Sequence, residues 1–309
     1  MSLIEEKLEQ ILKDLELIKK QLKIVPDRET VITDFESNVI YYQEFAKDEL
    51  GLEQPTIDNH KSAIMSFLNH SKGIINKDTV KVYLESNESD SWKTNQLKAL
   101  RRYIRDFLGL GNWINEFHFL KPKAKIKSIP DAQKIAKFIN LLPYKIQLVF
   151  LVMYNSGLRI NEILSLRLSN IDFESGMINA SELHKKKTKS SWISFVTNQT
   201  AKLLDNYMLS EEFEDDDIDP KLFSLSSRSV QEAFKKTSEE IGVSITPRLL
   251  RTIFAEKCTQ AGIQDKYIDA FCGRIPQSVL AKHYTDYSPE ALKTQYKKVE
   301  PYLSLELNY

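Results

Sequence analysis

The stretch SGLRINEIL occupies residues 156–164 and decides how the rest of the chain is interpreted. Gly157 suits a turn, and the aliphatic residues that follow it have the spacing of one side of a helix. Arg159 stands where that helix begins. A guanidinium at this place can combine its planar fork with helix N-terminal amides to bind a phosphate. The alternative is a structural pair with a carboxylate such as Glu162, so the phosphate hypothesis requires other arginines nearby.

Two further arginines lie in the stretch TPRLLRTIFA, residues 246–255. Thr246 suits an N-cap and Pro247 the first helical position, which predicts that a helix begins here. Arg248 and Arg251 are three residues apart and share a face of that helix. Two adjacent cations repel each other unless an anion lies between them. This spacing therefore favours an anion site.

Downstream, Gly273 is followed by Arg274, and Tyr284 comes ten residues after Arg274. With this series the chain resembles the tyrosine recombinase (phage integrase) family over roughly residues 27–300. The sharpest match is the 156–164 stretch, which is very similar to the first conserved box of that family.

The resemblance implies a catalytic set that is carried over onto Arg159, Lys186 or Lys187, Arg248, Arg251, Arg274 and Tyr284. In such enzymes the tyrosine oxygen attacks a DNA phosphodiester, forming a 3′-phosphotyrosine and a free 5′-hydroxyl, and a second 5′-hydroxyl reverses the step. Lysine is the general acid for the departing oxygen. Tyr287 and Tyr267 are the rival phenols. Neither ATP nor metal is implied.

Three features depart from the family pattern. Arg248 stands where histidine is commonest, and Arg274 replaces the histidine after glycine. The interval from Gly273 to the tyrosine is one residue longer than in typical bacterial members of the family. Arginine or lysine at the first of these positions looks like archaeal virus and plasmid integrases, which sometimes also carry an N-terminal coiled coil. Arginine is a poor proton carrier near neutral pH, so the histidine-based acid/base role is missing. His283 is either a flanking residue or a substitute proton carrier.

Residues 1–25 contain apolar residues at alternating spacings of four and three. This heptad pattern predicts a coiled coil for oligomerisation, and the alternative is an amphipathic helix packed on its own domain. The apolar positions are Ile4, Leu8, Ile11, Leu15, Ile18 and Leu22.

Residues 27–120 are predicted to form a helical core-binding domain that binds DNA. Helical patterns cover 31–50, 57–69, 78–85 and 91–108. Its expected DNA-binding residues are Arg101, Arg102 and Arg105. A basic linker, 121–129, is expected to follow DNA phosphates through Lys121, Lys123, Lys125 and Lys127.

Residues 130–309 are predicted to form the catalytic domain, with helices at 132–142 and 145–155. Alternating segments at 177–183 and 192–196 predict a β-hairpin with its tip at 184–189, where Lys185 and Lys189 are expected to contact DNA. The fold class is therefore mainly α, with a small β-hairpin or sheet.

The composition excludes several other protein classes. The 309 residues include 43 basic and 43 acidic side chains, but seven of the acids cluster between 211 and 219, so the remainder is basic. The two cysteines lie outside any Cys-x-x-Cys spacing, and there is no glycine-rich phosphate loop, so no cofactor is expected. The longest apolar run, 148–154, is too short to span a membrane, and the N-terminus does not read as a leader. A cytoplasmic, nucleoid-associated protein of a prokaryotic or virus-infected host is expected.

These observations predict a site-specific recombinase that integrates or excises a mobile element. Its partner is double-stranded DNA, and a homotetramer on two DNA sites is expected. Two alternatives stay open: a type IB topoisomerase-like relaxing enzyme, and a catalytically inactive DNA-binding regulator with an integrase fold.

Overall fold

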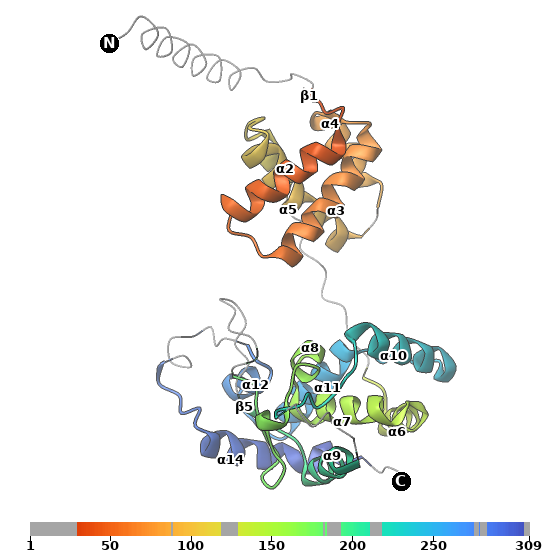
Figure 1. The fold of residues 1–309 in the computed structure, drawn as a ribbon, viewed down its shortest axis with the longest axis vertical. Helices are drawn as coiled ribbons and strands as arrows, with labels where there is room; N and C mark the ends of the chain where they lie inside the picture. The colour runs from red at the N-terminus through yellow and green to blue at the C-terminus, as the bar shows by residue number, and fades with distance from the viewer. Residues whose placement is uncertain are drawn as a thin grey trace, which may run out of the picture. The chain divides into compact units, whose positions relative to one another are not determined.

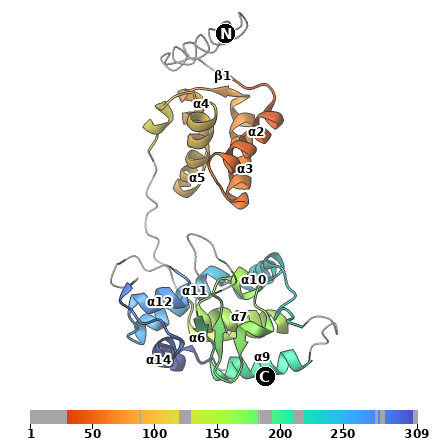
Figure 2. The ribbon, with the colours of Figure 1, turned by 60° about the vertical axis from the view of Figure 1, so that its left-hand side comes forward.

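The computed structural model describes residues 30–87, 89–118, 129–181, 183, 193–210, 218–274, 278 and 283–305. The chain divides into two compact units, Met1–Ile126 and Lys127–Tyr309 (Figures 1 and 2). The boundary falls in the stretch expected to be the linker. The predicted coiled coil, the linker residues 121–128 and the predicted hairpin tip lie outside the described residues.

The first unit is a helical bundle with one very short sheet, and polar caps fix the starts of its helices. The Asp34 carboxylate accepts a hydrogen bond from the amide of Ser37, and Asn76 accepts one from the amide of Thr79. The elements are β1 (Thr30–Val31), α2 (Phe35–Asp48), α3 (Gln54–Ser71), β2 (Ile74–Ile75), α4 (Lys77–Glu85), α5 (Asp90–Arg101), the π-helix η1 (Arg102–Phe107) and the 3-10 helix η2 (Trp113–Glu116).

Two features of this unit differ from the sequence expectation. The helix predicted over 91–108 is α-helical only to Arg101 and continues as the π-helix η1. The β1–β2 pair, with Thr30 opposite Ile75, was not predicted. Each of these strands has two residues, which is too few for an alternating pattern to be recognised.

The second unit is mainly helical and carries one three-stranded antiparallel sheet in the order β3–β4–β5. Its elements are α6 (Ala132–Leu141), α7 (Tyr144–Ser156), α8 (Ile160–Ile163), the 3-10 helix η3 (Leu168–Asn170), β3 (Ile171–Asp172), β4 (Met177–Asn179), β5 (Ile193–Phe195), α9 (Asn198–Ser210), α10 (Ser227–Ile241), α11 (Pro247–Gln260), α12 (Asp265–Phe271), α14 (Pro289–Val299) and the 3-10 helix η4 (Glu300–Leu303).

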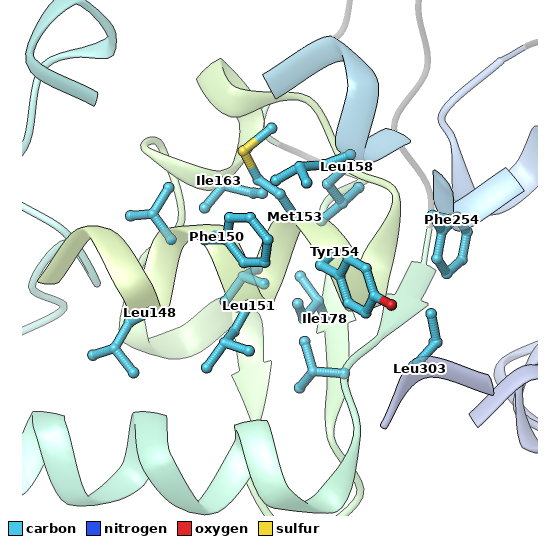
Figure 3. Packing of buried hydrophobic residues seen from close by; sticks show 14 of the residues in the cluster. Leu148, Phe150, Leu151, Met153, Tyr154, Leu158, Ile163, Ile178, Phe254 and Leu303 are labelled. Atoms are coloured by element: carbon cyan, nitrogen blue, oxygen red, sulfur yellow. The ribbon is translucent and has the colours of Figure 1, made fainter. Parts of the chain in front are cut away.

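Helix α7 lies in the middle of the second unit (Figures 1 and 2). All of its residues from Leu148 to Ser156 are buried, as is typical of a helix that neighbours cover on every side. Phe150 and Tyr154 lie among side chains from other elements, including Ile178 of β4 and Phe254 of α11 (Figure 3). The apolar run noted in the sequence is therefore the core of this unit. In the described part of the chain, no helix combines the length and apolar character needed to cross a membrane.

The predicted β-hairpin is present. Strand β4 pairs with β5 in antiparallel register, with Ile178 opposite Ser194 and Asn179 opposite Ile193. Ile178 and Ser194 are both fully buried, so this face of the sheet packs on the core. The segment between the two strands contains the predicted catalytic lysines.

Candidate active site

The turn after α7 determines where Arg159 lies. Gly157 ends the helix in the left-handed conformation, with φ of 68°, and its amide donates to the carbonyl of Met153. A Cβ atom at this position would collide with the ring of Phe254 and lie 3.2 Å from the sulfur of Cys272. Both the backbone conformation and the close packing therefore require glycine immediately before the Leu158–Arg159 step.

Arg159 is held by a carboxylate and by a backbone carbonyl. Its Nη1 atom lies 2.7 Å from Oε1 of Glu162, and Nη1 and Nη2 lie 3.1 and 3.2 Å from the carbonyl oxygen of Gly273. The structural pair with Glu162, considered as an alternative from the sequence, is therefore present. Because Glu162 is 2% exposed while the Arg159 side chain is 28% exposed, the carboxylate lies behind the guanidinium.

The helix that follows Arg159 is shorter than expected. α8 consists of one turn, and the amide of Arg159 donates to Oε2 of Glu162 at 2.7 Å. The expectation that a helix N-terminus here adds amide donors for a phosphate is thus not met at Arg159, because its amide is already occupied.

Arg251 projects from α11, whose predicted start is confirmed. Thr246 is the N-cap, accepting a hydrogen bond from the amide of Leu249 at 3.2 Å, and Pro247 is the first helical residue. The Nη1 atom of Arg251 donates to the carbonyl of Gly157 at 2.6 Å, and its Nη2 atom donates to that of Cys272 at 2.9 Å.

The guanidinium of Arg251 therefore has a fixed orientation but no carboxylate within 4.0 Å among the described residues. Burial lowers the pKa of Arg251, and the positive charges of Arg159 and Arg274 lower it further, while Cys272 and Glu162 oppose the shift. An anion bound between these three cations would remove this repulsion. The site is arranged to gain energy from a bound phosphate.

The four arginines singled out in the sequence all line one cavity of about 1490 Å³. Six basic and three acidic side chains line it in total, so the cavity has an excess of positive charge. Three of the cations have a carboxylate of the same lining within 4.0 Å, and the pairs are Arg159 with Glu162, Arg228 with Glu232, and Lys235 with Glu239. Of the other three cations, Arg274 pairs with Asp269, which does not line the cavity, so Arg248 and Arg251 supply the uncompensated charge among the described residues.

These last three arginines differ in how firmly they are held. Arg274 forms an ion pair with Asp269, 3.1 Å between Nη1 and Oδ1, and Asp269 also accepts the amide of Arg274 through its backbone carbonyl. Arg248 is exposed, and no carboxylate of the described residues is placed against it. Arg251 and Arg159 are thus fixed donors, while Arg248 is free to follow a ligand.

The tyrosines near the C-terminus have distinct environments. Tyr284 is 77% exposed and is not among the residues that line the cavity. Tyr287 packs edge-on against Tyr267, with 6.0 Å between ring centroids, and burial raises the pKa of Tyr287. Of these three phenols, Tyr284 is the most accessible, and its neighbour His283 is exposed as well.

The predicted lysines of the hairpin tip, Lys185, Lys186, Lys187 and Lys189, lie outside the described residues, as do Lys121, Lys123, Lys125 and Lys127 of the linker.

The arginines of the first unit have internal partners. Arg101 donates to the backbone carbonyls of Asn115 and Phe117. Arg102 and Arg105 both pair with Asp106, at 2.9 and 2.6 Å. Their role in DNA binding stays a prediction, and it requires these guanidinium groups to use their remaining N–H donors.

The sequence patterns did not predict a functional role for two residues of the site. Asp269 holds Arg274, and Glu162 positions Arg159. For Glu162, its position three residues after Arg159 was the sequence signal that could have indicated this pair. Asp269 precedes Arg274 without any pattern that could have indicated the pair. Within the described ranges, no group of three or more His, Cys, Asp or Glu side chains is arranged to hold a metal ion.

Comparisons with known proteins, by sequence and by structure, found relatives of this chain. Residues 126–290 match the phage integrase family. The chain is 29% identical over 236 residues to Tyrosine recombinase XerA of Saccharolobus solfataricus, an alignment that covers 69% of this chain and 76% of that protein.

Two solved structures share its fold. A lambda integrase dimer bound to a COC′ core site has a TM-score of 0.63 at 17% identity, covering 79% of this chain and 95% of that one. The Tn1549 transposon integrase in complex with circular intermediate DNA has a TM-score of 0.62 at 13% identity, covering 85% and 99%. The mainly helical architecture with small sheets is therefore the integrase fold.

Proposed function

We propose that this chain, which belongs to the phage integrase family of tyrosine recombinases, cleaves and rejoins double-stranded DNA through a 3′-phosphotyrosine intermediate. The observation that carries the proposal is the convergence of Arg159, Arg248, Arg251 and Arg274 on one cavity from separate parts of the sequence. A cavity with excess positive charge and oriented guanidinium groups suits a DNA phosphate.

In the cleavage step the Tyr284 oxygen attacks the phosphorus atom. One Tyr Oη–P bond forms and one P–O5′ bond breaks, so the number of phosphoester bonds is conserved and the reaction requires no ATP. The phenol loses a proton and the departing 5′-oxygen gains one. The second strand's 5′-hydroxyl reverses the same step, with the protons moving in the opposite directions.

Arg159 and Arg251 stabilise the charge that develops on the non-bridging oxygens. Both are held by protein acceptors before DNA binds, so their orientation costs nothing at the moment of reaction. Arg248 and Arg274 add positive charge at the same cavity. Lys186 or Lys187 donates the proton to the 5′-oxygen, because arginine does not release a proton near neutral pH.

Tyr284 is 77% exposed outside the cavity, so the proposal includes a movement of its segment when DNA binds. The finer parts of the proposal are a homotetramer acting on two DNA sites and the integration or excision of a mobile element. The coiled-coil pattern of residues 1–25 supports assembly, and the sequence likeness to XerA and the fold shared with the lambda and Tn1549 integrases support recombination as the reaction.

A suicide substrate tests the proposal. A duplex nicked close to the cleavage point loses a short 5′-hydroxyl fragment after cleavage, which traps the covalent complex. Wild-type protein is expected to accumulate a protein–DNA adduct that is stable in denaturant, Tyr284→Phe is expected to form none, and Tyr287→Phe is expected to form it. An adduct with Tyr284→Phe would refute the assignment of the nucleophile.

The second candidate is a DNA-binding regulator that does not cleave DNA. Arginine at both positions where the family commonly has histidine favours this candidate, as does the place of Tyr284 outside the cavity. The same assay separates the two, because a regulator binds the nicked duplex without forming an adduct.

A further inference from the structure

The carboxyl end of α7 is a meeting point for three other parts of the second unit. The last carbonyl groups of a helix have no partner within the helix and need other donors. Here the amide of Gly157 satisfies the carbonyl of Met153. After Tyr154 come the three consecutive carbonyls of Asn155, Ser156 and Gly157. Each of these three accepts a hydrogen bond from a side chain on a different element.

The three donors are Tyr296, Ser194 and Arg251. The Tyr296 hydroxyl, on α14, lies 3.1 Å from the carbonyl oxygen of Asn155. The Ser194 hydroxyl, on β5, lies 2.6 Å from that of Ser156. Arg251, on α11, lies 2.6 Å from that of Gly157.

Each donor element belongs to a segment that the proposed reaction uses. Helix α11 carries Arg248 and Arg251. Strand β5 follows the segment with Lys186 and Lys187, and helix α14 follows Tyr284. The carbonyl of Ser156 is only three residues from Arg159. One O–H···O bond therefore connects the strand that ends the lysine segment to the turn that carries the first arginine.

The surroundings of this bond make it well defined. Ser194 and Ser156 are both fully buried. The Ser156 hydroxyl donates to the carbonyl of Val152 and accepts the amide of Leu158, so it is not an alternative donor to the Ser156 carbonyl. If Ser194 is removed, that carbonyl is left buried without this donor.

We propose that Ser194 is a positioning residue: its hydroxyl holds β5, the strand that follows the lysine segment in the sequence, against the Arg159 turn, and thereby aligns the proton donor with the phosphate. This inference rests on the proposed function. Ser194 does not touch DNA in this account; it acts through the lysine. Loss of its hydroxyl should therefore weaken proton donation more than any other part of the reaction.

A change of leaving group isolates that effect. When the bridging 5′-oxygen is replaced by sulfur, the leaving group is a thiolate whose conjugate acid has a pKa of about 8.5, so it departs without a proton donor. Cleavage rates of the oxygen and sulfur substrates are measured for each variant under single-turnover conditions. The readout is the sulfur-to-oxygen rate ratio relative to wild type.

Ser194→Ala is expected to raise this ratio about 100-fold, because a misplaced general acid costs about two powers of ten on the oxygen substrate and nothing on the sulfur substrate. Ser194→Thr, which keeps the hydroxyl, is expected to restore most of the oxygen rate. Ser194→Cys is close in size and a weak donor, so it is expected to raise the ratio in the same direction if Ser194→Ala does not fold.

Two matched controls lose a buried hydroxyl elsewhere. Tyr296→Phe removes the neighbouring hydroxyl donor to α7 but keeps the ring that packs against Phe195 of β5, 5.3 Å between ring centroids. Ser71→Ala removes a buried hydroxyl that has no partner among the described residues. Both are expected to keep the wild-type ratio whatever their stability.

The outcomes distinguish a failure of the Ser194 inference from a failure of the proposed DNA cleavage. A wild-type adduct combined with a Ser194→Ala ratio within about 3-fold of wild type would overturn this inference alone, and so would an equal rise in Tyr296→Phe. If wild-type protein forms no adduct with either substrate, the proposed function fails and the inference fails with it.

Discussion

Arg251→Lys separates two contributions of this residue, its positive charge and the orientation of its donors. Arginine at 251 reaches two backbone carbonyls at once, 2.6 Å from Gly157 and 2.9 Å from Cys272. Lysine keeps the charge but has one nitrogen in place of the planar fork. The substitution therefore tests whether a preorganised fork, and not charge alone, is needed for cleavage.

The magnitudes follow from these contacts. At least one charged hydrogen bond is lost, which lowers the free energy of unfolding by about 1.5–3 kcal/mol. For a unit of this size the midpoint of thermal unfolding should then fall by roughly 3–12 °C. Loss of one oriented donor to the transition state costs about 3 kcal/mol, so cleavage should slow by about 100-fold or more.

The assay compares binding and cleavage in the same variant. Binding is measured by fluorescence anisotropy in a Tyr284→Phe background, and cleavage by adduct formation on the nicked duplex at a temperature where the variant is fully folded. Binding is expected to change less than about 3-fold, because the charge persists. Arg228→Lys is the control, since Arg228 lines the same cavity but pairs with Glu232 at its exposed rim.

If folded Arg251→Lys cleaves within about 3-fold of wild type, a preorganised fork at residue 251 is not needed for cleavage. A specific need for this fork is refuted equally if Arg228→Lys is as defective as Arg251→Lys, because a general loss of guanidinium groups would then explain the result.

Two further predictions concern stability. Gly157→Ala should lower the free energy of unfolding by about 2–5 kcal/mol, because it adds the cost of a left-handed backbone to a collision with the ring of Phe254. Gly242→Ala has nearly the same φ but nothing within 4 Å, so it should lower the free energy of unfolding by only about 1–2 kcal/mol. Urea unfolding measures both values, and equal losses would contradict the collision with Phe254. Burial first, and the charge of Arg102 second, lower the pKa of His60, so the unfolded state binds its proton more tightly and stability should fall as the pH drops below about 6.5. Thermal unfolding between pH 8 and 5 should show this loss in wild type and less of it in His60→Gln, and identical pH profiles would contradict the assignment.

Local patterns predicted the elements whose stabilising contacts are close in sequence. The start of α11 at Pro247 needed only Thr246 and the helical pattern after it. The apolar run within α7 and the β4–β5 hairpin were also readable from periodicity. The π-helix η1 was not, because nothing in the local pattern of 91–108 distinguishes it from a continued α-helix.

The candidate site was predictable as a set of residue types but not as an arrangement. The arginines could be named from their spacing, whereas the acceptors that orient them are backbone carbonyls far along the chain. Arg159 bonds to Gly273 across 114 residues, and Arg251 bonds to Gly157 across 94. Tyr296, across 141 residues from Asn155, is one of thirteen tyrosines with no distinguishing neighbour.

Locating the DNA-linked tyrosine identifies the nucleophile of the proposed cleavage. The adduct trapped on the nicked duplex is digested with nuclease and trypsin, and the modified peptide is sequenced by tandem mass spectrometry. Cleavage after Lys282 and Lys293 yields a peptide that contains both Tyr284 and Tyr287. The nucleotide is expected on Tyr284; a nucleotide on Tyr287, on Tyr267 or on any other residue would contradict the assignment of Tyr284 as the nucleophile.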